Sequence, residues 1–179
     1  AALLDAGHPT GLHVAALEHE AVVVSTTGDR ERDRPLSELG GKGVFVKEVQ
    51  AAVLDGRADQ AVHSAKDLPS TTPDGLVIAA VPERADPRDA LVGGRLDALP
   101  PGARIATGSA RRRAQLAAHR PDLTFVGLRG NMDTRLAAAA DHGAVVVACA
   151  ALDRLGRADE ISEVLDPQVV LPQAGQGTL

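Results

Sequence analysis

The sequence has 179 residues, a mass of 18.4 kDa and a net charge of −5, which suits one large domain or two small ones. Hydrophobic residues make up 44% and charged residues 24%, so the chain is globular rather than a disordered tail. Aromatic residues make up only 1%, which disfavours a stacking platform for single-stranded nucleic acid. The longest apolar run, residues 144–152, is much shorter than the roughly 20 residues that span a bilayer.

In chain order, the first half predicts short strands around one helix. Residues 21–26 form a β-branched run that ends at a Thr-Gly-Asp turn, which is typical of a strand. Apolar residues spaced along 44–54 predict an amphipathic helix closed by Asp55 and Gly56. Residues 59–63 and 76–81 are two further strand candidates.

The second half predicts a regular alternation of strands and helices. Residues 82–89 contain two prolines and five charges, so we interpret them as a connector and place a domain boundary there. The predicted strands are 105–107, 123–128 and 144–149, and the predicted helices are 109–119, 131–141 and a short one ending at Leu155. This order predicts parallel strands with crossover helices and a ligand site at the carboxyl ends of the strands.

Positive charge is concentrated in residues 104–135, which contain seven arginines and two aspartates, so this segment is +5 and the rest is −10. Ser109 suits a helix N-cap, yet Arg111 and Arg112 follow in the first turn, where the helix dipole disfavours cations. The unfavourable position of these two cations is explained if an anion binds at the start of the helix. A solvated, arginine-rich helix face is the alternative. Arg129, Asn131 and Arg135 repeat the arrangement one strand later.

Two other segments, residues 40–43 and 63–69, each allow two interpretations. Residues 40–43 (GGKG) lack the spacing of a nucleotide-binding loop, so they are either a loop that closes over a ligand or an ordinary glycine turn. Lys66 and Asp67 follow a predicted strand within 63–69 (HSAKDLP). They are either a surface ion pair or a cation and a carboxylate that serve an anionic substrate and a developing positive charge.

Cysteine and histidine suggest neither a disulfide nor a metal site. Cys149 is the only cysteine, and the N-terminal residues do not resemble a signal peptide, which predicts a reducing, cytoplasmic setting. Cys149 lies among valines and alanines and is more typical of a small core residue than of a nucleophile. The six histidines lack the spacing of metal ligands.

Seven segments in order resemble the porphobilinogen deaminase (hydroxymethylbilane synthase) family: LGGKGVFVKE at 39–48, AVHSAKDLP at 61–69, ERADPRDAL at 83–91, SARR at 109–112, LRGN at 128–131 followed by Thr134 and Arg135, LDRLG at 152–156, and PQAGQG at 172–177. The resemblance implies two α/β domains of the type-II periplasmic-binding-protein kind with the active site in the cleft between them. Domain 1 would be residues 1–82 plus 173–179, and domain 2 residues 83–172, with hinges near 82–89 and 172–177.

The resemblance also implies an activity and a site. Family members are transferases of porphyrin (haem) biosynthesis that condense four porphobilinogen molecules, with loss of ammonia, on a covalently held dipyrromethane cofactor. Asp67 matches the family's catalytic aspartate, which stabilises the cation left when ammonia departs. Lys66, the second catalytic candidate, matches one of the basic residues that hold the acetate and propionate groups of cofactor and substrate. The matching residues that bind cofactor and substrate are Ser64, Thr107, Ser109, Arg111, Arg112, Arg129, Asn131, Arg135 and Arg154, and Lys42 and Phe45 match the mobile active-site loop. No metal is implied.

Several departures qualify the expectation of activity. An N-terminal Arg-x-Ser-Pro-Leu-Ala motif, the family's third α+β domain and its cofactor-bearing cysteine have no counterpart here, and residues 15–20 resemble an insertion. Cys149 does not match the cofactor cysteine. We therefore expect a truncated monomer with weak or no turnover by itself. The competing hypothesis is a non-catalytic two-domain module that binds polycarboxylate pyrroles, and a third is an inactive fragment.

Overall fold

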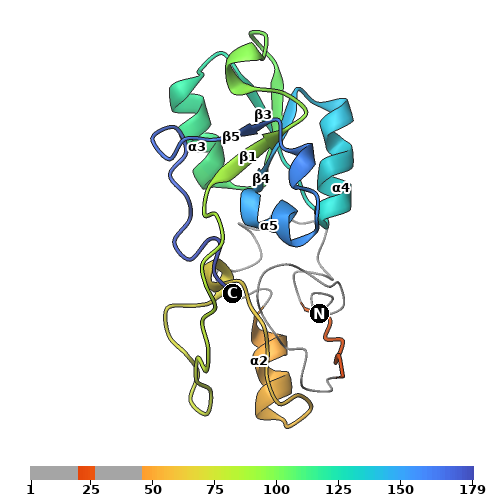
Figure 1. The fold of residues 1–179 in the computed structure, drawn as a ribbon, viewed down its shortest axis with the longest axis vertical. Helices are drawn as coiled ribbons and strands as arrows, with labels where there is room; N and C mark the ends of the chain where they lie inside the picture. The colour runs from red at the N-terminus through yellow and green to blue at the C-terminus, as the bar shows by residue number, and fades with distance from the viewer. Residues whose placement is uncertain (1–19, 27–45) are drawn as a thin grey trace. The chain divides into compact units, whose positions relative to one another are not determined.

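The structure is a computed structural model that describes residues 20–26 and 46–179. The chain divides into two units (Figure 1). Unit 1 comprises residues 1–83 together with 178–179, and unit 2 comprises residues 84–177. The chain therefore leaves unit 1 once and returns to it at the end. Within the described residues, none of the helices has the length and apolar character needed to cross a bilayer.

The described part of unit 1 contains one α-helix and one short 3-10 helix. Helix α2 spans Lys47–Leu54, and its inward-facing residue Ala52 is buried. It stops where the Asp55 amide donates to the Ala51 carbonyl at 2.8 Å and Gly56 takes a positive φ of 70°. The predicted helix is thus confirmed from Lys47 onward. The 3-10 helix η2 spans Ala65–Asp67.

Three strands predicted in this half are wrong: residues 21–26, 59–63 and 76–81 form no strand in the structure. Their β-branched residues favour an extended backbone, but a strand also needs a hydrogen-bonded neighbour. Among the described residues these segments form no such ladder, and Val23 and Val77 are 84% and 81% exposed. Local composition therefore predicted the strands, but among the described residues no neighbouring strand pairs with them.

Unit 2 is built on one five-stranded sheet with the order β3-β2-β4-β1-β5. The strands are β1 Asp89–Val92, β2 Arg104–Ala106, β3 Thr124–Val126, β4 Ala144–Ala148 and β5 Glu163–Val164. Strand β2 is parallel to both β3 and β4, which confirms the predicted parallel arrangement for these three strands.

Strands β1 and β5 correct the expectation of an all-parallel sheet. Strand β1 runs antiparallel to both β4 and β5. It begins at Asp89, inside the segment predicted to be a connector, and all four of its residues are buried. Neither strand is evident from the sequence, because β1 is too short to show alternation and β5 has only two residues.

Two apolar clusters fill the two faces of this sheet. Helix α3 (Ala110–His119) contributes Leu116 to the first cluster, where it joins Ile105 and Val146. Helix α4 (Met132–Ala137), followed by a 3-10 turn at Ala138–Asp141, and helix α5 (Cys149–Arg154) cover the second, which includes Val145 and Val147. Alternate residues of β4 thus point to opposite faces, as pleating requires. Helices α3 and α4 lie on opposite sides of the sheet in Figure 1.

Candidate functional site

The strand-to-helix turns of unit 2 meet at one edge of the sheet. Strands β2, β3 and β4 are parallel and in register, so the turns that follow them lie at their shared carboxyl edge. The Thr107 amide donates to the Val126 carbonyl at 2.9 Å. A Cβ at Gly108 would lie 2.5 Å from the Leu128 carbonyl oxygen, so this turn can approach the end of β3 only because residue 108 is glycine.

Side-chain caps begin both helices at this edge, as predicted. Ser109 accepts a hydrogen bond from the Arg112 amide at 3.4 Å, and its own amide donates to Thr107 Oγ1 at 3.2 Å. Asn131 Oδ1 accepts from the amide of Thr134 at 2.9 Å and from its hydroxyl at 2.8 Å. These bonds satisfy amides that a helix leaves unpaired at its start.

The anion beside Arg111 and Arg112 is a carboxylate of the chain itself. Because β1 is antiparallel, its first residue, Asp89, pairs with Ala148 at the end of β4 and so lies at the carboxyl edge. Asp89 is fully buried and accepts bonds from Arg111 Nη2 at 2.6 Å and Arg112 Nη2 at 2.7 Å. The side-chain amide nitrogen of Gln176 also donates to Asp89 Oδ1 at 2.7 Å.

These contacts decide the charge of Asp89. Burial by itself opposes ionisation, but the hydrogen bond and positive charge of Arg112, and then the hydrogen bonds from Arg111 and Gln176, outweigh it, so the pKa of Asp89 lies below its ordinary value. Asp89 is therefore ionised at neutral pH. The arginines that were expected to attract an anion from outside are balanced in part by an internal one.

The two arginines differ in how much of each side chain is exposed to a ligand. The side chain of Arg112 is 9% exposed, and its Nη1 donates to the Val146 carbonyl at 3.1 Å. The side chain of Arg111 is 25% exposed, and its Nη1 donates to the Leu171 carbonyl. The Nε atom of each is buried without a hydrogen-bond partner. Arg111 is thus the member of the pair that a ligand can reach.

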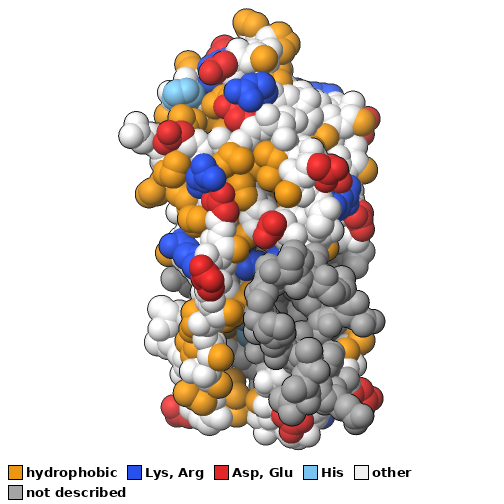
Figure 2. Space-filling view, viewed as in Figure 1, with side chains coloured by type: hydrophobic (Ala, Val, Ile, Leu, Met, Phe, Trp, Pro, Cys, Tyr) orange, Lys and Arg blue, Asp and Glu red, His pale blue; other side chains and the backbone are white. Residues whose placement is uncertain are grey.

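The other candidate arginines of unit 2 lie in the turn after β3 and in helices α4 and α5. Arg135 Nε donates to the Gly130 carbonyl at 2.9 Å, which holds the guanidinium beside the turn after β3. Arg129 lies in that turn and is half-buried. Arg154, in the last turn of α5, donates to the Gly177 carbonyl at 2.9 Å, and burial lowers its pKa. Lys and Arg side chains intermingle with Asp and Glu side chains on the face seen in Figure 2.

The candidate catalytic residues lie in unit 1. Lys66 and Asp67 belong to η2, Ser64 is its N-cap, and the Asp67 amide donates to the Ser64 carbonyl at 2.9 Å. The Ala65 amide donates to the Thr178 carbonyl at 2.9 Å, which connects this motif to the returning end of the chain. Asp67 is exposed and Lys66 half-buried. Lys42, Phe45 and the glycine-rich loop at 40–43 lie outside the described residues.

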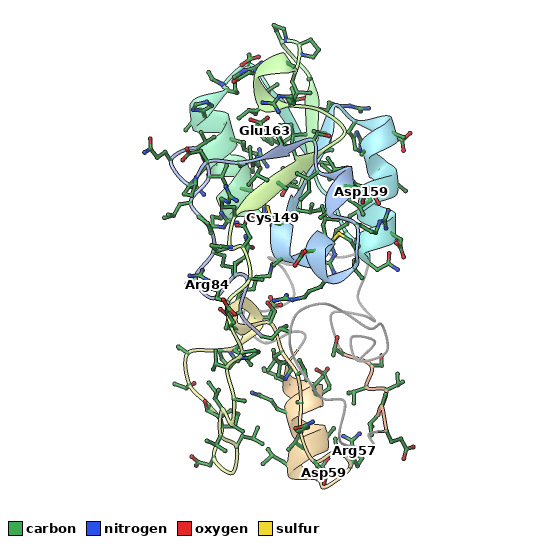
Figure 3. The ribbon with its side chains drawn as sticks, in the orientation of Figure 1. Arg57, Asp59, Arg84, Cys149, Asp159 and Glu163 are labelled. Carbon is green, nitrogen blue, oxygen red and sulfur yellow. The ribbon has the colours of Figure 1, made fainter. Side chains whose placement is uncertain are left out.

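Sequence reasoning missed Asp89 and Gln176. Asp89 stands in a charged, proline-containing stretch, where an aspartate is usually solvated, and no local pattern links it to a helix about 20 residues later. The one available signal was the apolar run 90–92 directly after it. Cys149, by contrast, is the predicted core residue: it is 4% exposed at the start of α5 (Figure 3), and burial raises its pKa to about 11. The described residues hold no cluster of three potential metal ligands.

The fold and the site define a mixed α/β domain with an arginine-rich carboxyl edge. A sequence model described as "Porphobilinogen deaminase, dipyromethane cofactor binding domain" matches residues 4–179. The chain is 52% identical to a porphobilinogen deaminase of Roseiflexus sp. (strain RS-1), with 98% of this chain and 58% of that protein covered. It is also 52% identical to a porphobilinogen deaminase of Syntrophus aciditrophicus, over 89% of this chain and 54% of that protein.

A probable porphobilinogen deaminase of Methanopyrus kandleri is likewise 52% identical, over 91% of this chain and 56% of that protein. The chain belongs to the porphobilinogen deaminase family, in its cofactor-binding part. It spans a little over half the length of these relatives.

Proposed function

We propose that this chain forms the catalytic part of a porphobilinogen deaminase, the transferase that condenses four porphobilinogen molecules to hydroxymethylbilane with release of ammonia. The observation that carries the proposal is the family match over residues 4–179. The arginine-rich edge of unit 2 supports it, because the acetate and propionate groups of pyrrole substrates need cationic partners. We further propose that the protein acts as a cytoplasmic monomer on this small molecule, without nucleic acid or membrane.

The family resemblance also underlies a proposed architecture. We assign residues 1–82 with 173–179 to one periplasmic-binding-protein-like domain and residues 83–172 to a second, with the substrate in the cleft between them. Hinges would lie near 82–89 and 172–177. The division of the chain into units at Glu83 and Gly177 is compatible with this assignment.

In the proposed mechanism, the Asp67 carboxylate accepts hydrogen bonds from pyrrole N–H groups and stabilises the positive charge that develops as ammonia leaves. A carboxylate is suited to this role because catalysis requires a fixed charge placed where the opposite charge appears. Its exposure leaves Asp67 accessible to a ligand. Lys66 would supply a cation for a substrate carboxylate, and Lys42 and Phe45 would belong to the loop that closes over the site.

The residues of unit 2 fit a dipyrromethane cofactor, whose side chains end in carboxylates. Arg111 is a quarter exposed, and Nη1 and Nη2 each carry a second N–H beyond the bonds to Leu171 and Asp89, so it can donate to an added anion. When bound, dipyrromethane supplies the pyrrole carbon to which substrate is joined. Cofactor and substrate carboxylates would be held by residues on the turns and helices of unit 2, with Ser64 contributing from unit 1. They are Thr107, Ser109, Arg111, Arg112, Arg129, Asn131, Arg135 and Arg154.

The role of Asp67 can be tested in the protein expressed from the complete reading frame that encodes this sequence. We expect Asp67→Asn to abolish ammonia release and hydroxymethylbilane formation, because the neutral amide cannot stabilise the developing cation. Asp59→Asn, another change in unit 1, is the matched control and should keep wild-type rates. Circular dichroism would verify the fold of both variants. A wild-type rate in Asp67→Asn would refute the assigned role.

The second candidate function is a binding module without chemistry, favoured by the arginine-rich edge considered alone. Calorimetry with porphobilinogen, run beside the ammonia assay, separates the two functions. Binding with no ammonia released by the wild-type protein would favour the module. Binding accompanied by turnover would establish the enzyme.

A further inference from the structure

One buried carboxylate serves two adjacent guanidinium groups at the start of α3. Asp89 Oδ2 lies 2.6 Å from Arg111 Nη2, and Asp89 Oδ1 lies 2.7 Å from Arg112 Nη2. Arg112 is further fixed by the Val146 carbonyl inside the sheet. Two positive charges against one negative leave the cluster with a net charge of +1, which suits a single ligand carboxylate. Only Arg111 is exposed enough to meet that ligand directly.

Gln176 connects this cluster to the segments by which the chain enters and leaves unit 2. Its amide nitrogen donates to both Asp89 Oδ1 and the Pro87 carbonyl at 2.7 Å. The backbone carbonyl of Gln176 accepts from Arg84 Nε at 2.9 Å, and the backbone carbonyl of Gly177 accepts from the Ala85 amide at 3.0 Å. The two segments are thus hydrogen-bonded to each other, and one bond joins them to the carboxylate that holds the arginines.

We propose that Asp89 is a positioning residue: it fixes Arg111 for a pyrrole carboxylate and, through Gln176, makes that geometry depend on the paired segments 84–89 and 176–177. This inference rests on the proposed function for the identity of the ligand. Arg112, held by the Val146 carbonyl, fixes the Asp89 carboxylate, and the exposed part of Arg111 lies at the edge. Without the carboxylate, two adjacent cations would repel each other and the long side chain of Arg111 would lose its fixed orientation.

A double-mutant cycle tests whether Asp89 acts through Arg111. In the protein from the complete reading frame, we expect Asp89→Asn to raise the KM for porphobilinogen about tenfold, a coupling typical of residues in contact. In the Arg111→Ala background the same change should alter KM less than about twofold, because the positioned group is gone. Asp122→Asn breaks an ion pair with Arg120 elsewhere in unit 2 and is the control, with KM unchanged.

Thermal unfolding separates positioning from folding. Asp89→Asn should lower Tm in both the wild-type and the Arg111→Ala backgrounds, and by less in Arg111→Ala, because only its contact with Arg112 remains to be lost there. A lowered Tm with unchanged KM would overturn the proposal, as would an equal rise in KM in both backgrounds. If Asp89→Asn fails to fold, Gln176→Met replaces it. That variant removes one bond to Asp89 at similar volume, and the same non-additive pattern is expected.

A readout independent of catalysis is the ¹⁵N spectrum of the arginine side chains. We expect the wild-type protein to show slow rotation and resolved Nη signals for Arg111, and Asp89→Asn to abolish them. A freely rotating Arg111 in the wild type would contradict the positioning role even if the enzyme is active. Absence of turnover together with a restrained Arg111 would instead count against the proposed function alone.

Discussion

The buried carboxylate of Asp89 partly explains why two arginines stand in the first turn of α3. The helix dipole disfavours arginines in the first turn of α3. From the sequence alone, their position there is explained only if an anion binds beside them. That anion is in part a side chain from β1, fully buried and bonded to both guanidinium groups. The cluster leaves one positive charge for a ligand, and it makes the ionisation of Asp89 a contributor to stability.

Acid should therefore destabilise the protein partly through Asp89. Its pKa in the folded protein lies below the value of about 3.9 expected in the unfolded chain, so the unfolded chain binds the proton more readily. The contribution to stability is complete above about pH 4 and is lost as the pH falls through the lower, folded-state pKa. Thermal unfolding of wild type and Asp89→Asn should differ strongly at pH 7 and converge in acid. A difference in Tm that does not change with pH would contradict this.

Cys149 should be unreactive in the folded protein. Burial raises its pKa to about 11, so at pH 8 the thiolate is about 200-fold scarcer than in an unfolded chain with the ordinary pKa of about 8.5. We expect alkylation by iodoacetamide to be slower by at least that factor in native protein than in urea. Mass spectrometry should likewise find no dipyrromethane on Cys149. Rapid native alkylation or such an adduct would show that the thiol is accessible.

The helices and parallel strands of unit 2 were the most predictable elements. Ser109 and Asn131 begin α3 and α4 through side-chain caps, and strands β2 to β4 lie within a few residues of their predicted positions. Capping and parallel crossover connections act over short stretches of sequence, so local patterns reveal them. The antiparallel strands β1 and β5 depend on neighbours more than 50 residues distant along the chain and were not predicted.

The segment that leaves unit 2 depends on a glycine. Gly177 has a φ of 89°, and a Cβ there would lie 2.4 Å from the Ala85 carbonyl oxygen. We expect Gly177→Ala to lower the free energy of unfolding by at least about 1 kcal/mol, since alanine strains the backbone and separates the paired segments. Gly102→Ala is a useful comparison because φ is also positive but a Cβ there meets nothing within 4 Å. Urea unfolding should show the larger loss for Gly177→Ala, and equal losses would contradict the contact.

For the molecule as a whole, the uneven distribution of charge along the chain is reduced by folding. Residues 104–135 carry +5, but Arg111 and Arg112 share Asp89 from outside that segment, and Arg120 pairs with Asp122 within it. The described part of unit 2 therefore does not present an uninterrupted basic surface. A localised site for a small carboxylate ligand agrees better with this pattern than a general polyanion-binding face.

Unit 2 is one continuous segment with its own two-faced core, so we expect residues 84–177 to fold alone. A fragment ending at residue 175 should unfold at a lower temperature, because it lacks the bonds that Gln176 and Gly177 make to Asp89, Pro87 and Ala85. A fragment ending at residue 179 is the control and should match 84–177. Calorimetry on the three fragments tests this, and identical Tm values would show that the terminal bonds add nothing.

The sequence by itself determined the family, the α/β class, the helix caps, the buried cysteine and the segment in which arginines are concentrated. These follow from motifs and periodicities that act over a few residues. Only the tertiary structure decided that β1 is an internal antiparallel strand, that residues 21–26, 59–63 and 76–81 form no ladder among the described residues, and that Asp89 bonds both Gln176 and the arginines at the start of α3. Each depends on groups far apart in the chain, and the burial that gives such contacts their strength exists only once the sheet has formed.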